Sequence, residues 1–122
     1  MGAVTILLVD DDESVRTSLH RLLSANGYQV DEASDRSSAL EKARARRPQI
    51  MILDLHMSSS SGFQIASALR ADPMLRAIGL IAFSASIPDW DEGLKLFDQV
   101  IEKPAPAGVL LDAIARTLGR LH

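Results

Sequence analysis

Short apolar runs alternate along the whole chain with longer segments in which apolar residues recur every three to four positions. An apolar run bounded by turn residues predicts a β-strand, and apolar residues at helical spacing predict an amphipathic helix. This alternation occurs five times, so the chain reads as five strands, each followed by a helix. The predicted strands are residues 4–9, 28–33, 50–53, 78–83 and 99–102.

The third apolar run, Ile50–Leu53, has no polar interruption and leads directly into Asp54. A strand that lacks polar alternation is typically buried on both faces, as in a parallel sheet. The run at 28–33 is more polar, and we expect it nearer an edge of the sheet. Asp54 then lies at the carboxyl end of a central strand, where open α/β sheets place their binding crevices.

Polar and turn-forming residues mark the ends of the predicted helices. The acidic run 10–13 opens the first helix, because carboxylates accept hydrogen bonds from free amides and suit the positive end of the helix dipole. Asn26-Gly27 ends that helix, Ser34 or Asp35 caps the second, and Pro48 stops the second. The remaining helices are expected over 62–71, over a short segment at 87–97, and at the end of the chain, where the last helix is expected to bury Leu110, Ile114, Leu118 and Leu121.

Alternating strands and helices favour an α/β fold in which helices cover both faces of a parallel sheet. Right-handed crossovers leave few topologies open. The simplest for five units is a flavodoxin-like, doubly wound five-stranded parallel sheet in the order 2-1-3-4-5 with five helices. At 122 residues, the chain has the size of one domain, spanning 1–122.

Composition excludes several classes of function. The formal net charge of −3 argues against direct nucleic-acid binding, which requires a basic face. The chain has no cysteine, which rules out disulfides and thiolate metal sites and fits a cytoplasmic location. No apolar run approaches the roughly 18 residues that a membrane span needs, so no membrane contact is expected.

Charged and hydroxyl side chains stand where four of the predicted strands end. Each has an ordinary explanation by itself, as a helix cap, a turn residue or a solvated loop residue. Parallel strands deliver their carboxyl ends to one edge of the sheet, however, so all of these side chains are expected to meet there. They are Asp10 and Asp11 after the first strand, Asp54 after the third, Ser84 at the fourth and Lys103 after the fifth.

Three carboxylates held close together repel one another, and a hard cation relieves that repulsion. An all-oxygen site that retains some waters suits Mg²⁺ or Mn²⁺. Phosphoryl transfer requires neutralised phosphoryl oxygens and an in-line nucleophile. We therefore interpret Asp54 as a nucleophile that forms an acyl phosphate, with the metal, Lys103 and Ser84 each contacting one phosphoryl oxygen.

These residues, in this order, resemble the receiver domain of two-component response regulators over essentially the whole chain. The resemblance rests on Leu8-Val9-Asp10-Asp11, Leu53-Asp54 with Met57 and Gly62, Ala82-Phe83-Ser84-Ala85, and Lys103-Pro104.

The resemblance implies that Asp11, Asp54 and the backbone carbonyl of His56 ligate Mg²⁺ and that Asp10 acts through water. It implies a phosphohistidine donor, on a histidine kinase or a histidine phosphotransfer protein, and a switched surface for a downstream protein target or effector domain. A second copy of the same chain, forming a homodimer, is a further possible partner. It also implies that the Lys103-Pro104 bond is cis.

The chain departs from the family pattern in several places. Serine replaces the usual proline at Ser58 and the usual acidic or amide residue at Ser61, which predicts a more mobile loop. Val100 occupies the position of a common aromatic residue, and the stretch between Ser84 and Lys103 is short, so we expect a compact fourth helix. His56 and Ser86 occupy positions at which the family tunes the lifetime of the phosphoryl group; solvent-facing loop residues are the alternative interpretation.

Three alternatives to a phosphoacceptor module stay open at this point. A haloacid-dehalogenase-type phosphatase also uses a strand-end aspartate with Mg²⁺, but it places a second aspartate where this chain has His56. A flavodoxin-like FMN binder needs hydroxyls and glycines, rather than acids, after the first strand. The third alternative is a receiver-like protein-interaction module with weak or unconventional phosphorylation-driven switching. The retention of all five site residues speaks against it, and the altered switch region, with Val100 at the usual aromatic position, keeps it open.

Overall fold

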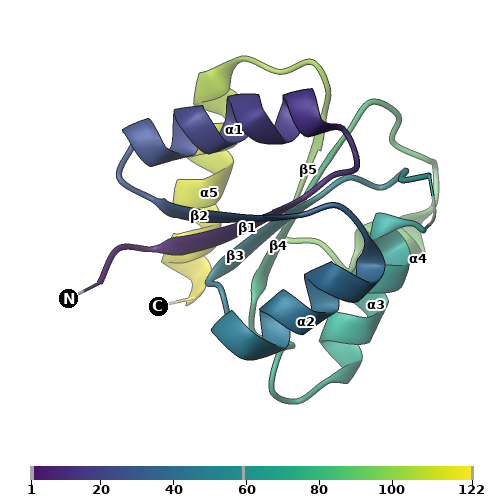
Figure 1. Cartoon of the computed structure of the whole chain (residues 1–122). Coiled ribbons are helices and arrows are strands. Elements are labelled where there is room, and N and C mark those ends of the chain that lie inside the picture. Colours follow the sequence, from purple (N-terminus) through teal and green to yellow (C-terminus); the bar gives the residue numbers. More distant parts are fainter. Residues whose placement is uncertain (1, 59, 122) are drawn as a thin grey trace.

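A parallel sheet lies at the centre of the protein, between two layers of helices (Figure 1). The structure is a computed structural model, and it describes residues 2–58 and 60–121. In chain order, the elements are β1 Thr5–Val9, α1 Glu13–Ala25, β2 Gln29–Ala33, α2 Arg36–Arg46, β3 Ile50–Leu53, α3 Gly62–Ala71, β4 Gly79–Ser84, α4 Asp91–Leu94, β5 Gln99–Glu102 and α5 Ala107–Leu121.

The five strands follow the order β2-β1-β3-β4-β5, and every neighbouring pair is parallel. The predicted flavodoxin-like topology is therefore confirmed. The polar strand β2 lies at one edge of the sheet, as expected, and β5 lies at the other. The uniformly apolar β3 lies in the middle, where all four of its residues are buried.

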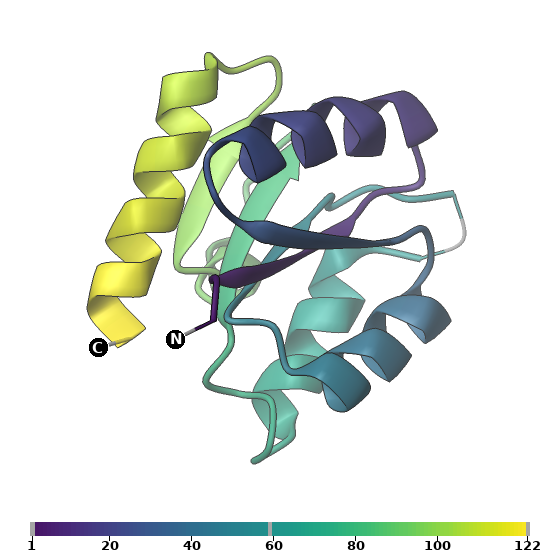
Figure 2. The same cartoon turned by 60° about the vertical axis from the view of Figure 1, so that its left-hand side comes forward.

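Alternate residues of each strand face opposite helical layers. Leu7, Met51 and Leu80 belong to the core beneath α2 and α3, whereas Ile6 and Ile52 belong to the core beneath α1 and α5. Figure 2 shows α1 and α5 on one face of the sheet and α2 and α3 on the other. Because both faces of the central strand β3 are covered, it needed apolar residues at every position.

Aspartate side chains cap the first two helices, as the sequence indicated. Asp12 accepts from the Ser14 amide at 2.9 Å, and Asp35 accepts from the Ser38 amide at 2.8 Å. Hydrogen bonds from these serines hold the pKa of each capping carboxyl below its ordinary value. The stability that the caps contribute is therefore present above the ordinary pKa and is lost as pH falls through the lowered one.

The fourth helix is shorter than predicted. We expected helical structure from 87 to 97, but α4 is a single turn, Asp91–Leu94, with no side-chain cap at Trp90. The connection from the end of β4 at Ser84 to the start of β5 at Gln99 is short, yet it must run back along the length of the strands. A helix advances only about 1.5 Å per residue, against about 3.3 Å for extended chain, so part of this connection is extended rather than helical. The half-exposed Trp90 ring packs edge-on against Phe63, with centroids 4.8 Å apart.

The last helix also differs from the prediction at its end. Leu121 was expected in the core but is 39% exposed, and the buried positions of α5 are Leu110, Ala113, Ile114 and Thr117. Thr117 already packs beside Gly79, the first residue of β4. Leu121 lies one helical turn farther along, beyond the start of that strand, so the sheet does not cover it.

Candidate phosphoacceptor site

The carboxyl ends of four strands bring together all five side chains that the sequence singled out. Asp10 and Asp11 follow β1, Asp54 follows β3, Ser84 ends β4 and Lys103 follows β5. Since β1, β3, β4 and β5 are consecutive neighbours in the sheet, their ends converge on one rim. The structure thus places these residues where the topology predicted them.

The three aspartates form an acidic cluster. One carboxylate oxygen from each of Asp10, Asp11 and Asp54 lies within 4.8 Å of the others. Asp10 and Asp54 are only 5% and 8% exposed, whereas Asp11 is exposed at the rim. Closely spaced carboxylates at this burial require a positive charge, and oxygen donors of this kind are the ligands that Mg²⁺ prefers. The residues fit a hard divalent cation.

Asp54 is held mainly through one of its two carboxylate oxygens. The buried Ser84 hydroxyl donates to Oδ1 at 2.7 Å, and the His56 amide donates to the same oxygen at 3.1 Å. The second oxygen, Oδ2, lies 3.7 Å from Lys103 Nζ, beyond hydrogen-bonding distance. Asp54 therefore keeps one oxygen that the protein does not hold tightly.

Lys103 forms its hydrogen bond with Asp10 and only a longer ion pair with Asp54. Its Nζ donates to Asp10 Oδ2 at 2.7 Å and lies 5.5 Å from the centre of the Phe83 ring. The Lys103-Pro104 peptide bond is cis, as the resemblance implied. The ammonium group is thus positioned between the two buried aspartates and offsets part of their negative charge.

Asp11 makes a contact that the sequence did not suggest. The Ser58 amide donates to its Oδ2 at 2.8 Å and holds the pKa of Asp11 below its ordinary value. Proline, the residue more common at position 58 in the family, has no N–H and cannot make this bond. The serine that we expected to loosen this loop therefore also provides a link between the loop and the acidic cluster.

The matched family model is the response regulator receiver domain, over residues 6–115. This chain belongs to the response regulator receiver domain family. Response regulator MprA of Mycobacterium ulcerans (strain Agy99) is 35% identical over 122 residues, which cover 97% of the chain and 51% of the relative. The chain therefore spans about half the length of the curated relatives it matches.

Solved structures agree with this assignment. Chemotaxis protein CheY4 of Vibrio cholerae has a TM-score of 0.88 at 26% identity, covering 95% of this chain and 99% of that one. A sensor protein from Polaromonas sp. JS666 has a TM-score of 0.87 at 25% identity, covering 98% of each chain. Receiver domains are phosphoacceptor signalling domains of two-component systems rather than enzymes in the usual sense, and this chain is one of them.

The loops around the receiver site are tied together by His56. Its side chain is exposed, and Nε2 lies 3.0 Å from the Ser86 carbonyl, which joins the loop after β3 to the loop after β4. The contact uses the backbone of Ser86, and the hydroxyl is on an exposed residue. A lifetime-tuning role for either residue stays a prediction.

A small hollow lies behind the buried acids, toward the apolar core. It has a volume of about 10 Å³, room for about one water molecule, and Leu8, Leu19 and Ile52 line it together with Asp10 and Asp54. A hollow of about 620 Å³ lies away from the acidic cluster, where Tyr28, Lys42 and Pro48 line it. Within residues 2–58 and 60–121, no helix is both long and apolar enough to cross a bilayer.

Gly62 fixes the backbone behind the phosphoacceptor candidate. A Cβ atom at this position would lie 2.3 Å from the Asp54 carbonyl oxygen, closer than real Cβ contacts come. The Gly62 amide also donates to the Leu55 carbonyl at 3.2 Å. The start of α3 therefore packs directly on the end of β3, and this approach requires glycine.

We expect Gly62→Ala to destabilise the protein by about 2 kcal/mol, because the inserted methyl group must displace the backbone at Asp54. The same displacement should slow phosphorylation by acetyl phosphate. Urea unfolding and initial labelling rates test both effects. Gly108→Ala is the matched control, since a Cβ there meets no described atom within 4 Å. Equal stability of the two variants would contradict this account of Gly62.

Proposed function

We propose that Asp54 accepts a phosphoryl group from a phosphohistidine on a histidine kinase or a histidine phosphotransfer protein. An Asp54 carboxylate oxygen attacks phosphorus, the P–N bond breaks, and the imidazole leaves with the electron pair. Water later hydrolyses the acyl phosphate. The observation that carries this proposal is the position of Asp54, between two acids and Lys103, with Oδ1 held by Ser84 and Oδ2 at 3.7 Å from Lys103 Nζ.

The position of the site supports a donor that another protein presents. Asp11 and His56, which flank Asp54 at the rim, are both exposed. A phosphohistidine carried on a protein surface can reach acids at such an edge. In this proposal, the partner approaches the rim at which β1, β3, β4 and β5 end, and a cytoplasmic location provides access to such partners.

The acidic cluster would hold Mg²⁺, or Mn²⁺, through the carboxylates of Asp11 and Asp54 and the backbone carbonyl of His56, with Asp10 acting through water. When bound, the metal neutralises charge on the phosphoryl oxygens. Asp10 keeps the Lys103 ammonium group beside the reacting carboxylate, at 2.7 Å from its own Oδ2.

Ser84 and Lys103 provide the switch in this proposal. Before phosphorylation, the Ser84 hydroxyl donates to Asp54 at 2.7 Å, and Lys103 donates to Asp10 at 2.7 Å. A phosphoryl group on Asp54 offers new acceptor oxygens to both donors, because phosphate binds lysine and hydroxyl groups strongly. Both side chains then exchange partners, and the strand ends that carry them move with them, altering the surface presented to a downstream protein.

A receiver-like interaction module with unconventional switching is the second candidate. Two observations favour it. Val100, at the position of the common aromatic residue, is 38% exposed on edge strand β5, and α4 is a single turn. Spectra of the amide groups with and without phosphorylation separate the candidates: large shifts across β4, β5 and α4 support the switch, and shifts confined to the site support the module.

Asp11→Asn tests the metal site directly. We expect Mg²⁺ affinity to fall at least about tenfold, because the variant loses an anionic ligand at the rim. Titration calorimetry at pH 7 measures it, and labelling by acetyl phosphate should then require correspondingly more Mg²⁺.

Asp12→Asn is the matched control for Asp11→Asn. It removes a charge next to Asp11 but retains the cap of α1, because asparagine caps helices as well as aspartate does. Unchanged Mg²⁺ affinity in Asp11→Asn, or an equal loss in Asp12→Asn, would rule out the proposed ligand set.

A further inference from the structure

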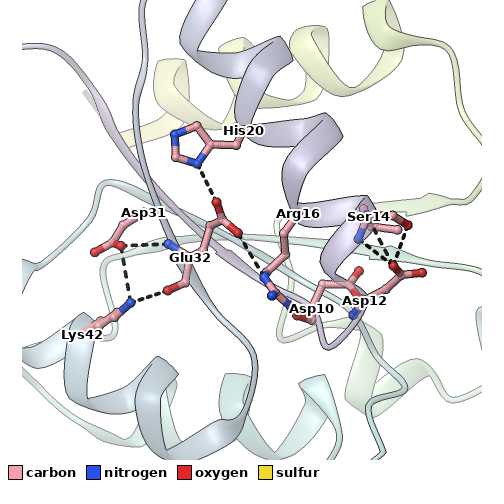
Figure 3. Close-up of polar contacts among 9 residues, drawn as sticks. Asp10, Asp12, Ser14, Arg16, His20, Asp31, Glu32 and Lys42 are labelled. Atoms are coloured by element: carbon pink, nitrogen blue, oxygen red, sulfur yellow. Dashed lines mark hydrogen bonds and ion pairs between the residues drawn. The ribbon is translucent and has the colours of Figure 1, made fainter.

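Arg16 links helix α1 to the acidic turn and to edge strand β2. Its Nη1 donates to the backbone carbonyl of Asp10 at 2.6 Å, and its Nε donates to Glu32 Oε1 at 3.0 Å. Figure 3 shows the guanidinium group between these two acceptors. The Arg16 side chain is only 16% exposed. The sequence did not single out this residue, which lies at a polar position of an amphipathic helix.

The Asp10 carbonyl, which Arg16 contacts, lies just beyond the end of β1 and takes no part in the hydrogen bonding of the sheet. β1 ends at Val9 and β2 ends at Ala33, and the hydrogen bond at the end of this strand pair runs from the Asp10 amide to the Ala33 carbonyl at 3.2 Å. Asp10 is 5% exposed, so water does not readily replace a partner for its carbonyl. A buried acceptor without a partner is costly. Arg16 supplies the donor that the ladder no longer provides.

With this bond, all four polar atoms of Asp10 have protein partners. The amide bonds Ala33, the carbonyl bonds Arg16, Oδ1 accepts from the Asp12 amide at 2.9 Å, and Oδ2 accepts from Lys103 at 2.7 Å. The turn that carries Asp10 and its neighbour in the acidic cluster is therefore held at both its backbone and its side chain. Arg16 is the one of these four partners that comes from the body of α1.

Glu32 in turn orients Arg16. One Glu32 oxygen accepts from Arg16, and the other lies 2.7 Å from His20 Nδ1, one helical turn farther along α1 (Figure 3). The carboxylate therefore has fixed contacts on both oxygens. A guanidinium group pinned at Nε has little freedom to turn Nη1 away from the Asp10 carbonyl.

We propose that Arg16 is a positioning residue for the divalent-cation site, acting through the Asp10 backbone and held in place by Glu32. The proposal rests on the function proposed above, in which this acidic cluster binds Mg²⁺. Arg16 contacts neither the metal nor the phosphoryl group. It fixes the main chain from which the carboxylates of Asp10 and Asp11 project, so the acids are arranged before the cation arrives.

Arg16→Met tests this role, because methionine retains an unbranched apolar stem and removes every donor. We expect the dissociation constant for Mg²⁺, measured by calorimetry, to rise about tenfold, as is typical when an outer partner of a metal ligand is lost. Labelling by acetyl phosphate at saturating Mg²⁺ should change less than about threefold, since the reacting groups remain. A merely structural arginine would lower the melting temperature without moving Mg²⁺ affinity.

Arg21→Met is the matched control on the same helix, where Arg21 is exposed. Its Mg²⁺ affinity should equal that of the unmodified chain. Arg16→Lys, which retains a donor for the Asp10 carbonyl but has a single ammonium group to share with Glu32, should recover part of the lost affinity. If both Arg16 variants match the control, the proposal is wrong.

Glu32→Gln keeps the test decisive even if Arg16→Met fails to fold. Loosening the anchor should weaken Mg²⁺ binding in the same direction but less. The double variant should bind Mg²⁺ no worse than Arg16→Met alone, because Glu32 acts through Arg16. Unchanged affinity in Glu32→Gln, or additive losses in the double variant, would overturn the proposal. Failure of the underlying function looks different: the unmodified chain itself would neither bind Mg²⁺ nor become labelled.

Discussion

Asp54→Asn is expected to abolish labelling by acetyl phosphate, with a loss of roughly three orders of magnitude or more, as is typical when a nucleophile is removed. An asparagine amide cannot form the acyl phosphate, although it fills the same space. Its carbonyl oxygen still accepts from the Ser84 hydroxyl and the His56 amide, which both contact Asp54 Oδ1 at present. The loss should therefore reflect chemistry rather than misfolding.

The measurement is acid-labile, hydroxylamine-sensitive label on the purified chain with Mg²⁺ present. Asp112→Asn serves as the control, because Asp112 is an exposed aspartate of α5 whose partner is Arg116 in the next turn. That variant should be labelled as fully as the unmodified chain. Label with the same chemical properties on Asp54→Asn would refute the assignment of the phosphoacceptor.

Thermal unfolding without metal provides a second readout for the same variant. Removing one charge from the cluster of Asp10, Asp11 and Asp54 relieves repulsion among carboxylates that lie within 4.8 Å of one another. Lys103 would keep its closer partner, Asp10, at 2.7 Å. Asp54→Asn should therefore unfold at the same temperature as the parent chain or at a higher one, and a large decrease would show that Asp54 has a structural role.

Arg70→Met is expected to cause the largest loss of stability, about 3 kcal/mol. The Arg70 side chain on α3 joins three carbonyls and one carboxylate: Nε donates to Leu96 at 3.0 Å, Nη1 to Arg76 at 2.6 Å and to Ile78 at 2.8 Å, and Nη2 to Asp98 Oδ2 at 3.2 Å. These partners belong to the connections that precede β4 and β5. Arg70 therefore links helix α3 to the two segments that lead into β4 and β5.

The expected loss is smaller than for a fully buried pair, because the Arg70 and Asp98 side chains are 25% and 24% exposed and water screens part of their attraction. Methionine retains most of the apolar stem, so the hydrogen bonds account for most of the change. Equilibrium unfolding in urea measures the difference.

Arg116→Met is the control for Arg70→Met. It removes an exposed helical pair with Asp112, in which Arg116 is 69% exposed, and should cost less than about 0.5 kcal/mol. If Arg70→Met costs no more than Arg116→Met, the network around Arg70 contributes little to stability.

Much of the fold was predictable because its determinants are local. A strand buried on both faces needs apolar residues at every position, and Ile50–Leu53 shows this pattern directly. The polar composition of 28–33 indicated an edge strand, because a strand at the edge is less completely covered and tolerates polar residues. Asp35 marks the start of α2 because its side chain caps the helix. Gly27, with φ at +90°, marks the end of α1 because glycine readily adopts a left-handed conformation.

The five candidate site residues were predictable through topology. Every side chain that follows a strand in a parallel sheet reaches the same rim, so the order of the strands was sufficient to bring Asp10, Asp54 and Lys103 together. Their chemistry was then evident from residue type. The length of α4 was overestimated, because the spacing of hydrophobic residues does not indicate how far apart in space the two ends of a connection lie.

Hydrophobic period and residue type by themselves thus predicted the five strands and, once crossover rules had favoured one strand order, the rim at which charge collects. Tertiary structure alone decided which groups form hydrogen bonds there: Lys103 with Asp10 rather than Asp54, the Ser58 amide with Asp11, and Arg16 with the Asp10 carbonyl just beyond the end of β1. The physical reason is that a long cationic side chain or a loop amide has several possible acceptors within a few ångströms. Which of them it bonds depends on distances that the packing of segments far apart in the sequence sets.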